Sequence, residues 1–470
     1  MTTRKVPHPT LEERREAGRL ARRRMPRSSL EGWQPAADRP DPVGLLQTQN
    51  EAREPDLVPV RHGRMMVSPF TFYRGGAKIM AADLAHIPRA GLDVQLCGDA
   101  HLSNFGAYAS PARTLVFDLN DFDETLPGPF EYDVARLAAS FAVASRDNGF
   151  KASRSAEAAA ASVAAYRTAM AGFAGMRTLD VWYSRVDAQE IVEKATAGVK
   201  KSRRKLAAAA EKNIAKVRTK DSLQALSKLT EVVDGYHRII SAPPVVVPAR
   251  ELAETYGFAP DELRAMLQER LRSYRSTLPY DRRRVLERFE FVDFARKVVG
   301  VGSVGTRAWI ALLQGRDGED PLFLQIKEAT ASVLEDHLPK SRFRQPGERV
   351  VQGQRLMQAA SDILLGWTKG VQEGRFYYWR QLRDMKGSAL IELFDPEAMN
   401  YYAGVCGWTL ARAHARSGDP VAISAYLGSS DRFDRAMTDF AVRYADQNER
   451  DYDAFAQAIR SGKLEATEGV

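Results

Sequence analysis

Two short stretches of this chain combine side chains that suit the chemistry of phosphate groups. Residues 97–106 read CGDAHLSNFG, and residues 120–125 read NDFDET. Transfer of a phosphoryl group needs a carboxylate facing the acceptor hydroxyl and oxygen ligands that hold magnesium on the phosphates. Asp99 and Asn104 lie five residues apart, and Asp121 supplies the next acid. The pattern therefore predicts a base and a metal ligand on one loop, with a further metal ligand soon after it.

The first of these loops resembles one in a known superfamily. GDAHLSN (98–104) is similar to the Gly-Asp-x-His-x-x-Asn loop of the aminoglycoside phosphotransferase branch of the kinases. In that branch a further Asp lies twelve residues after the metal-binding Asp and begins a helix. Asp133 lies twelve residues after Asp121 and fifteen after Asp118. The resemblance therefore implies that Asp121 is a magnesium ligand and that Asp133 supports the loop.

The same resemblance assigns roles within the loop, position by position. It implies that Asp99 is the catalytic base and that Asn104 is a magnesium ligand. His101 is expected to order the loop. Cys97 stands where relatives often have His, so that position departs from the pattern.

The second motif leaves the choice of metal ligand open. Asp123 and Glu124 lie next to Asp121 in sequence and are alternative ligands. A competing interpretation is that both stretches are Asp-rich turns between strands, where Asp side chains often bond to the backbone. Two linked motifs with matching offsets favour phosphotransfer over plain turns.

A glycine-rich stretch, GVGSVG at 300–305, matches the pattern G-x-G-x-x-G. By itself this pattern is weak evidence of a nucleotide site. The next residues, TRAWIALLQG, are rich in strand formers, whereas a dinucleotide site would continue into a helix. A strand, a glycine loop and a second strand form the kinase arrangement. The residues expected to contact ATP are therefore Gly300, Gly302, Ser303 and Gly305.

A third strand is predicted to end in LQIKEA, which places Lys327 where kinases hold a phosphate-binding lysine. The alternative is an ordinary lysine at a strand end. In kinases such a lysine pairs with a carboxylate on the next helix. Glu335 and Glu348 are the candidates, and Glu348 is preferred because its separation of 21 residues from Lys327 leaves space for a linker.

The order of these motifs is reversed relative to an ordinary kinase. Gly300 follows Asp99 by 201 residues, although the glycine loop and its lysine should come before the base. The economical explanation is circular permutation, with the catalytic lobe first and the nucleotide lobe later. The stretch YAGVCGWTLARAHARSGD (402–419) resembles the helix that normally precedes the base loop. Within it, His414 is expected to be a packed structural residue.

The chain as a whole looks like a bacterial family known as domain of unknown function 2252. The likeness covers most of residues 60–420 and is carried by FYRGGAKIMAADLA, CGDAHLSNFG, FDLNDFDET, QIKEA, RVVQGQRLMQAASD and LARAHARSGD. Membership implies the permuted kinase-like arrangement and supplies no substrate.

These observations predict an α+β, kinase-like fold of two lobes that is largely helical outside its sheets. The expected parts are a basic arm at 1–60, a catalytic lobe with a helical extension at 61–285, a glycine-loop lobe with an antiparallel sheet at 286–395, and returning helices at 396–470. Short apolar runs such as MMVSPFTFYRG (65–75) are interpreted as strands.

The permuted arrangement makes a geometric prediction. Asp99, Asn104 and Asp121 should line one wall of a cleft, and Lys327 should face them from the other. Lys327 and Asp121 should lie within roughly 10 Å of each other, because both must reach the same triphosphate. An apolar slot for adenine is expected beside the glycine loop, lined by strand residues of the segment 298–330.

Composition excludes several other classes of protein. With 470 residues, 44% hydrophobic and 27% charged, the chain is typical of a globular protein of two or three packed units. No apolar run approaches the length of about eighteen residues that a membrane span needs, and the first residues do not resemble a secretory signal. The two cysteines, Cys97 and Cys406, favour a reducing cytoplasm over a disulfide framework. Oligomeric state does not follow from the sequence.

The formal charge of +8 is concentrated in part in KKSRRKLAAAAEKNIAKVRTK (200–220). We interpret this segment as an exposed helix that borders the cleft or a partner surface. Binding of nucleic acid, through Lys200, Lys201, Arg203 and Arg204, is the alternative. It is disfavoured because no aromatic residue interleaves with these cations.

The function predicted from the sequence is an ATP- and Mg²⁺-dependent phosphotransferase that acts on a hydroxyl or amine of a small-molecule acceptor. The alternatives are transfer of AMP to protein from the same cleft, and a nucleotide-binding regulator without catalysis. The presence of Asp99, Asn104, Asp121 and Lys327 argues against the regulator.

Overall fold

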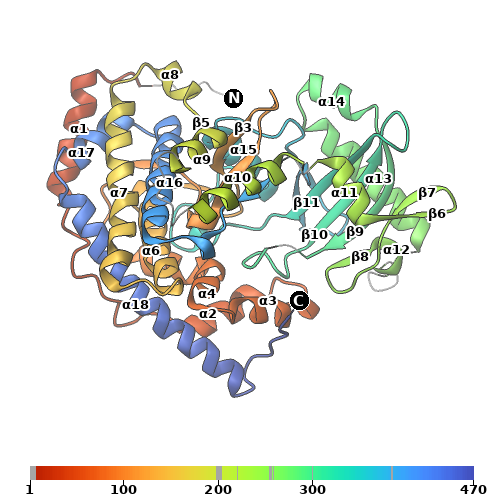
Figure 1. Cartoon of the computed structure of the whole chain (residues 1–470), viewed down its shortest axis with the longest axis horizontal. Coiled ribbons are helices and arrows are strands. Elements are labelled where there is room, and N and C mark those ends of the chain that lie inside the picture. The colour runs from red at the N-terminus through yellow and green to blue at the C-terminus, as the bar shows by residue number, and fades with distance from the viewer. Residues whose placement is uncertain are drawn as a thin grey trace.

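Six antiparallel strands form the largest sheet of the computed structural model, on the right in Figure 1. Their spatial order is β12-β13-β11-β10-β9-β8. The strands are β8 (Val246–Pro248), β9 (Glu290–Lys297), β10 (Ala308–Gln314), β11 (Pro321–Glu328), β12 (Gly366–Lys369) and β13 (Phe376–Gln381). The predicted succession of strand, glycine loop, strand, hairpin and strand is therefore confirmed for β9, β10 and β11.

The structure describes most of the chain. The described residues are 7–196, 204–219, 221–252, 257, 259–298, 300–382 and 385–469. None of the described helices combines the length and the apolar character that crossing a bilayer requires. The mixed α+β class expected from the sequence is confirmed.

Helices cover both faces of the six-stranded sheet, and they shift the expected lobe boundary. One face, which includes Ile326, packs against α13 (Pro260–Ser276) and α14 (Tyr280–Leu286). The other face, which includes Phe323, packs against α11 (Ser222–Leu229). Residues from about 222 onward thus pack with the glycine-loop sheet, whereas a boundary near 285 was expected. The helical signal of this segment gave no indication of which core it joins.

A second, smaller sheet lies in the helical part of the molecule and carries the two acidic motifs. Its order is β14-β2-β3-β5. Strands β1 and β4, which come directly before β2 and directly after β3 in the chain, form a separate two-stranded pair. The strands are β1 (Asp93–Leu96), β2 (Phe105–Ala109), β3 (Leu115–Leu119), β4 (Leu126–Pro129), β5 (Val186–Asp187) and β14 (Gly387–Ser388). The acidic motifs occupy the connections between these strands, which brings them to one edge.

The C-terminal helices return to this first part of the molecule, as predicted. Helix α16 (Pro396–Ser417) packs along α7 (Ala152–Ala174), and α18 (Arg432–Arg460) packs on α6 (Phe130–Asp147). In Figure 1 the blue C-terminal helices lie beside the yellow and orange helices of the first half. Burying these apolar faces joins the two ends of the chain in one core.

Residues 7–60, expected as a basic arm, pack against the C-terminal helices. Helix α1 (Leu11–Arg24) lies against α17 (Pro420–Leu427), and α2 (Pro42–Asn50) contacts α18. Ala21 and Leu46 are completely buried. Helix α1 ends in three arginines, which agrees with the basic character expected for this arm.

The segment 65–75, predicted as a strand, is helical instead. Helix α3 (Val58–Met65) is followed by α4 (Pro69–Gly75). The side chain of Ser68 accepts a hydrogen bond from the backbone N–H of Thr71, and Pro69 stands at the first helical position. A capped start with proline in the first turn favours a helix despite the aromatic, strand-like composition.

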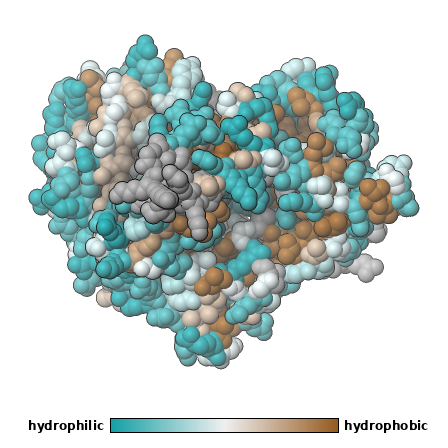
Figure 2. All heavy atoms as spheres, viewed as in Figure 1, coloured by the Kyte–Doolittle hydropathy of each residue, from teal (hydrophilic) through white to brown (hydrophobic). Residues whose placement is uncertain are grey.

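The remaining elements surround these two sheets. They include α5 (Ala77–Ala85), α8 (Thr178–Tyr183), α9 (Ala188–Thr196), α10 (Arg204–Arg218), α12 (Ala249–Leu252), α15 (Pro346–Met357), β6 (Thr230–Val233) and β7 (Tyr236–Ile239). Figure 2 shows a largely hydrophilic face over the helical part, with apolar residues gathered toward the sheet lobe on the right. Val232 and Val233, on the β6–β7 hairpin, are among the exposed apolar residues.

Candidate active site

The loop between β1 and β2 carries Asp99, and helix α6 supports it through hydrogen bonds to the loop backbone. The carboxylate of Asp133, in the first turn of α6, accepts hydrogen bonds from the backbone N–H groups of Cys97 (2.7 Å) and Gly98 (3.0 Å). Gly98 has φ +87°, and a Cβ there would lie 2.2 Å from the carbonyl oxygen of Glu124. Asp133 therefore supports this loop, the role that the family resemblance implied for it.

His414 supports the same carboxylate from helix α16. Its Nε2 lies 3.2 Å from Asp133 and its Nδ1 lies 2.9 Å from the hydroxyl of Tyr166. The ring is completely buried. This packing agrees with the structural role expected for His414.

Asp99 is held by a cation and borders a cavity. Arg136 Nε donates to one carboxylate oxygen at 2.8 Å, while His101 Nε2 lies 3.8 Å from the other. The side-chain amide of Asn104 donates to the backbone carbonyl of Asp99 at 2.6 Å. Burial raises the pKa of the Asp99 carboxyl, and Arg136 opposes that rise. Burial also lowers the pKa of His101 well below its usual range, so its imidazole is neutral at pH 7.

The second motif meets Lys327, which comes from β11. Lys327 Nζ lies 2.6 Å from Asp123 Oδ2 and 3.5 Å from Asp121 Oδ1. Tyr378, opposite Lys327 in the β11–β13 register, donates its hydroxyl to the other oxygen of Asp123 at 2.7 Å. Burial and the neighbouring Asp123 raise the pKa of Asp121. Lys327 and Tyr378 outweigh burial at Asp123, so the pKa of that carboxyl is lowered.

The predicted partner of Lys327 is wrong. The ion pairs of Lys327 within the described chain are to Asp121 and Asp123, and Glu348 is not among them. Glu348 lies in the first turn of α15, and the next residue, Arg349, is the one that turns toward the motif. Register on a helix decides which of two neighbours points inward, and one residue changes the direction by about 100°.

Arg349 and Glu335, the other candidate partner of Lys327, brace the acidic motif instead of the lysine. Arg349 donates to the backbone carbonyls of Asp123 (2.7 Å) and Thr125 (2.5 Å). Glu335 lies 3.9 Å from Arg349. Glu124, an alternative metal ligand by sequence, accepts a hydrogen bond from the backbone N–H of Val333 at 2.7 Å. These contacts fix the loop that presents Asp121 and Asp123.

The glycine loop is held against the N-terminal segment 53–75. Arg64 donates to the carbonyl of Gly300 and Arg53 to that of Val304, both at 2.5 Å. A Cβ at residue 302 would lie 3.0 Å from the carbonyl oxygen of Arg74, so a glycine allows this close approach. The loop is therefore positioned by residues that precede the acidic motifs in the chain.

These segments enclose a cavity of about 300 Å³. The predicted site residues that line it are Asp99, His101, Asn104, Asp121, Asp123, Gly300, Gly302 and Ser303. Lys327 lies behind the lining and reaches it through its two carboxylate partners. Gly305 and Glu348 do not line this cavity. Eight of the eleven predicted site residues thus share one space.

The cavity also contains cations that the sequence analysis did not single out. Arg53 and Arg74 line it beside Gly302. Burial lowers the pKa of Arg53 to about 10 and lowers that of Arg74, although Asp99 counteracts the effect at Arg74. The Nε atoms of both arginines are buried without a hydrogen-bond partner. The stretch FYRGG (72–76) contains a signal for this role, because Arg74 is a cation within an apolar run. The sequence analysis interpreted that run as a strand.

The expected adenine slot is not part of the acidic cavity. An apolar pocket of about 80 Å³ that includes strand residues Trp309 and Ile326 lies instead on the sheet face opposite Lys327. From the segment 298–330, the acidic cavity is lined by the glycine loop, by Thr306, by Glu328 at the end of β11 and by the residues that follow it. On the face of the sheet that bears Lys327, Ile310, Leu312 and Phe323 pack under α11 in an apolar core. Helix α11 covers this part of the sheet face, because its apolar side packs against it.

Oxygen ligands in the cavity fit magnesium only together with phosphates. The described residues hold no group of three or more His, Cys, Asp and Glu side chains placed to bind a metal. Asp121, Asp123 and Asn104 offer two carboxylates and one amide oxygen. Magnesium in nucleotide sites is commonly held by one or two carboxylates, with phosphates and waters completing the octahedron.

The described part of the basic segment, residues 204–219, packs in the helical part of the molecule. Residues 197–203 and 220, including Lys200, Lys201 and Arg203, lie outside the described residues. Helix α10 packs on α9 and β14, with Lys212 and Lys216 exposed. This placement agrees with the expected exposed helix.

One family model matches the chain. It is described as an uncharacterized protein conserved in bacteria (DUF2252), and the match covers residues 53–458. Searches of curated proteins and of solved structures found no significant match.

Proposed function

Because the chain belongs to the bacterial family DUF2252, whose description assigns no activity, we propose its function from the site alone. The proposal is an ATP- and Mg²⁺-dependent phosphotransferase with a permuted, kinase-like arrangement. Its acceptor is a hydroxyl or an amine of a small molecule.

The contact between Lys327 and the NDFD motif carries this proposal. The two partners are 206 and 204 residues apart in sequence, yet Lys327 Nζ lies 3.5 Å from Asp121 and 2.6 Å from Asp123. This distance satisfies the limit of roughly 10 Å set by a shared triphosphate. An ordinary strand-end lysine is exposed to solvent, whereas Lys327 is 3% exposed and pairs with two acids from a distant motif.

The other cavity residues support the same chemistry. The free oxygen of Asp99 borders the cavity, so it is available to accept the proton of an acceptor hydroxyl while Arg136 holds the opposite oxygen. Arg74 provides positive charge in the cavity lining, and Lys327 provides it behind Asp121 and Asp123. Magnesium, when bound with nucleotide, would neutralise phosphate charge between Asp121, Asp123 and Asn104. Positioning and electrostatics supply most of the catalysis in phosphoryl transfer.

Two features of the environment complete the proposal. Cys97 and Cys406 are free and buried, which is compatible with a reducing cytoplasm. The cations of the described part of α10 lie outside the acidic cavity, so we assign nucleic acid no part in the reaction.

Labelled ATP tests the proposal directly. Purified protein is incubated with MgCl₂, a pool of small metabolites, and ATP labelled at either the α- or the γ-phosphate. We expect γ-label in a small molecule, and none when Asp99→Asn protein is used. Label from the α-phosphate on protein would instead establish AMP transfer. Nucleotide binding without any transfer would establish a regulator and overturn the proposal.

A further inference from the structure

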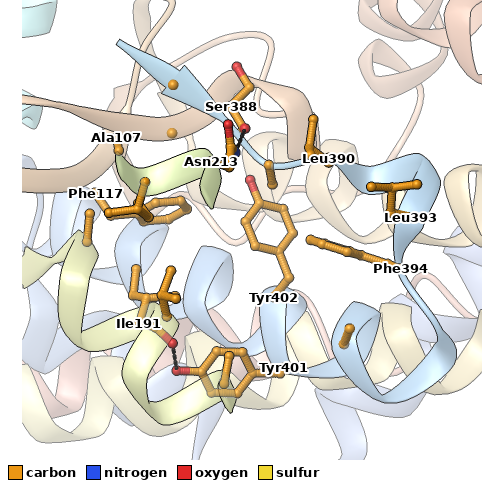
Figure 3. Close-up of a pocket in the computed structure, with 18 of the residues that line it drawn as sticks. Ala107, Phe117, Ile191, Asn213, Ser388, Leu390, Leu393, Phe394, Tyr401 and Tyr402 are labelled. Carbon is orange, nitrogen blue, oxygen red and sulfur yellow. Dashed lines mark hydrogen bonds between the residues drawn. The ribbon is translucent and has the colours of Figure 1, made fainter. Parts of the chain in front are cut away.

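A second cavity, of about 270 Å³, lies behind the loop that carries Asp99. It is enclosed by the sheet β14-β2-β3, by helices α9 and α10, and by the start of α16. Figure 3 shows Phe117 and Ile191 on one side and Leu393 and Phe394 on the other, all directed toward the same space. The lining residues of this cavity and of the acidic cavity do not overlap.

The lining of the second cavity is mainly apolar. Its walls include Ala107, Phe117, Ile191, Val217 and Leu390. An apolar enclosure of this size favours displacement of water by an apolar ligand.

The polar side chains that face this space already have hydrogen-bond partners. Asn213 donates to the carbonyl of Ser388 at 3.0 Å, and the hydroxyl of Tyr401 donates to that of Ile191 at 3.1 Å (Figure 3). Lys194, at the edge, pairs with Glu190 at 3.1 Å. A charged ligand would gain little here and would lose its hydration.

We propose that this second cavity binds an uncharged, mainly apolar small molecule, and that the bound molecule stabilises the Asp99 loop. A cavity of 150 Å³ accommodates benzene, so one of 270 Å³ accommodates about eleven non-hydrogen atoms. A bicyclic aromatic or a medium-length acyl chain has this size. The binding step does not depend on the proposed phosphotransfer.

Tyr402 connects the second cavity to the Asp99 loop. Its ring lines the cavity, and its hydroxyl donates to the backbone carbonyls of Leu102 (3.0 Å) and Phe105 (3.3 Å). Those two residues flank Asn104, and the cavity-lining residue Ala107 follows on the same strand. A ligand packed against Tyr402 restricts the ring that holds this loop in place.

Calorimetric titration with 1-naphthol, which has about eleven non-hydrogen atoms, tests the binding step. We expect one saturable site on the full chain, and binding of 1-naphthalenesulfonate at least about tenfold weaker because of its charge. Ala398→Phe places a ring in the cavity from α16 and should weaken naphthol binding by about tenfold or more. Ala215→Phe adds the same ring on the exposed side of α10 and should leave binding unchanged.

Three results would overturn the binding step: no saturable binding of 1-naphthol, equal binding of the sulfonate, or equal weakening by the two phenylalanine variants. If Ala398→Phe does not fold, Ile191→Trp fills the cavity from the opposite wall and gives the same comparison.

Hydrogen exchange tests the connection to the loop. We expect 1-naphthol to slow amide exchange in residues 100–107 of the wild-type protein, and to do so less in Tyr402→Phe protein, which still binds it. Saturating naphthol without any change in exchange over these residues would refute the connection.

Discussion

Replacing Lys327 with methionine tests the central contact of the site. The side chain of Lys327 is 3% exposed, and the carboxylates of Asp121 and Asp123 are 30% and 28% exposed. Methionine preserves the apolar length of the side chain and removes the ammonium group. The variant therefore leaves two adjacent carboxylates without the cation that forms ion pairs with them, and with Arg380 as a remaining cation that lowers the pKa of both.

The size of the effect follows from this geometry. Removing one partner of a buried ion pair costs about 3–5 kcal/mol, because the remaining charge is uncompensated. Since both acids retain some contact with water, we expect the lower end, about 3 kcal/mol at pH 8. Lys78 supplies a matched control, because it pairs with Asp336 at 2.7 Å but that acid is 52% exposed. Lys78→Met should cost less than about 1 kcal/mol.

The loss should depend on pH and on magnesium. Lys327 lowers the pKa of both acids, so its removal raises both. A carboxyl whose pKa in the folded protein exceeds that in the unfolded chain loses stability as pH rises through that range. The deficit of Lys327→Met should thus be smaller at pH 5.5 than at pH 8. A divalent cation can replace the charge of the ammonium group. Addition of about 10 mM Mg²⁺ should therefore recover part of the stability that Lys327→Met loses.

Urea unfolding followed by tryptophan fluorescence measures these differences, and nucleotide titration measures the loss of ATP binding. The double variant Lys327→Met/Asp123→Asn should recover stability relative to Lys327→Met, since it removes one uncompensated charge. Equal costs for Lys327→Met and Lys78→Met, with no response to pH or magnesium, would refute the reasoning.

Three other substitutions separate the proposed roles of residues in the acidic cavity, and a fourth tests a buried carboxyl outside it. Asp99→Asn should abolish transfer and leave the Kd for Mg·ATP within about threefold of wild type, because the base acts on the acceptor. Asp121→Ala should weaken Mg²⁺-dependent ATP binding itself, and similar residual turnover in both variants would contradict the assignment. Arg74→Gln should weaken ATP binding by about tenfold or more, the effect of losing one charge-assisted hydrogen bond, as titration would show. Burial raises the pKa of Glu131 from 4.5 to about 7, which corresponds to about 3 kcal/mol. The stability of the wild-type protein relative to Glu131→Gln should therefore decrease as the pH rises from 4.5 to 7. Urea midpoints of the two proteins that change in parallel across that range would exclude this effect.

Local spacing made much of the acidic site predictable. The support of the Asp99 loop by Asp133 was implied by the resemblance to the aminoglycoside phosphotransferase branch, whose offset of twelve residues matches that between Asp121 and Asp133 in one continuous stretch of chain. The glycine loop and Lys327 were located because strand formers on both sides of GVGSVG predict a hairpin. Such signals operate over a few residues, so they survive without knowledge of the tertiary structure.

Features set by packing between distant segments were not predictable in this way. Glu348 and Arg349 both lie near the start of α15, and only the docking of that helix decides that Arg349 faces the NDFD motif. The cover of α11 over Phe323, on the sheet face that bears Lys327, likewise depends on a helix from another part of the chain. No pattern in the segment 222–229 indicates which sheet this helix covers.

The N-terminal segment shows why the six-stranded sheet and the helical part of this chain cannot be treated as independent. Asp56 and Glu54 form ion pairs with Arg296 (2.8 Å) and Arg307 (2.6 Å), which flank the glycine loop on β9 and just before β10. Arg53 and Arg64 hold the carbonyls of the loop itself. If the glycine loop moves away from Asp99 and opens the acidic cavity, these contacts must break, or the N-terminal segment must move together with the loop. Because the segment continues directly into α3 and α4, which pack on the helical part, breaking the contacts costs several partly buried charge pairs at once. A nucleotide that enters this cavity therefore meets a glycine loop already fixed in place, whose position is set by the start of the chain.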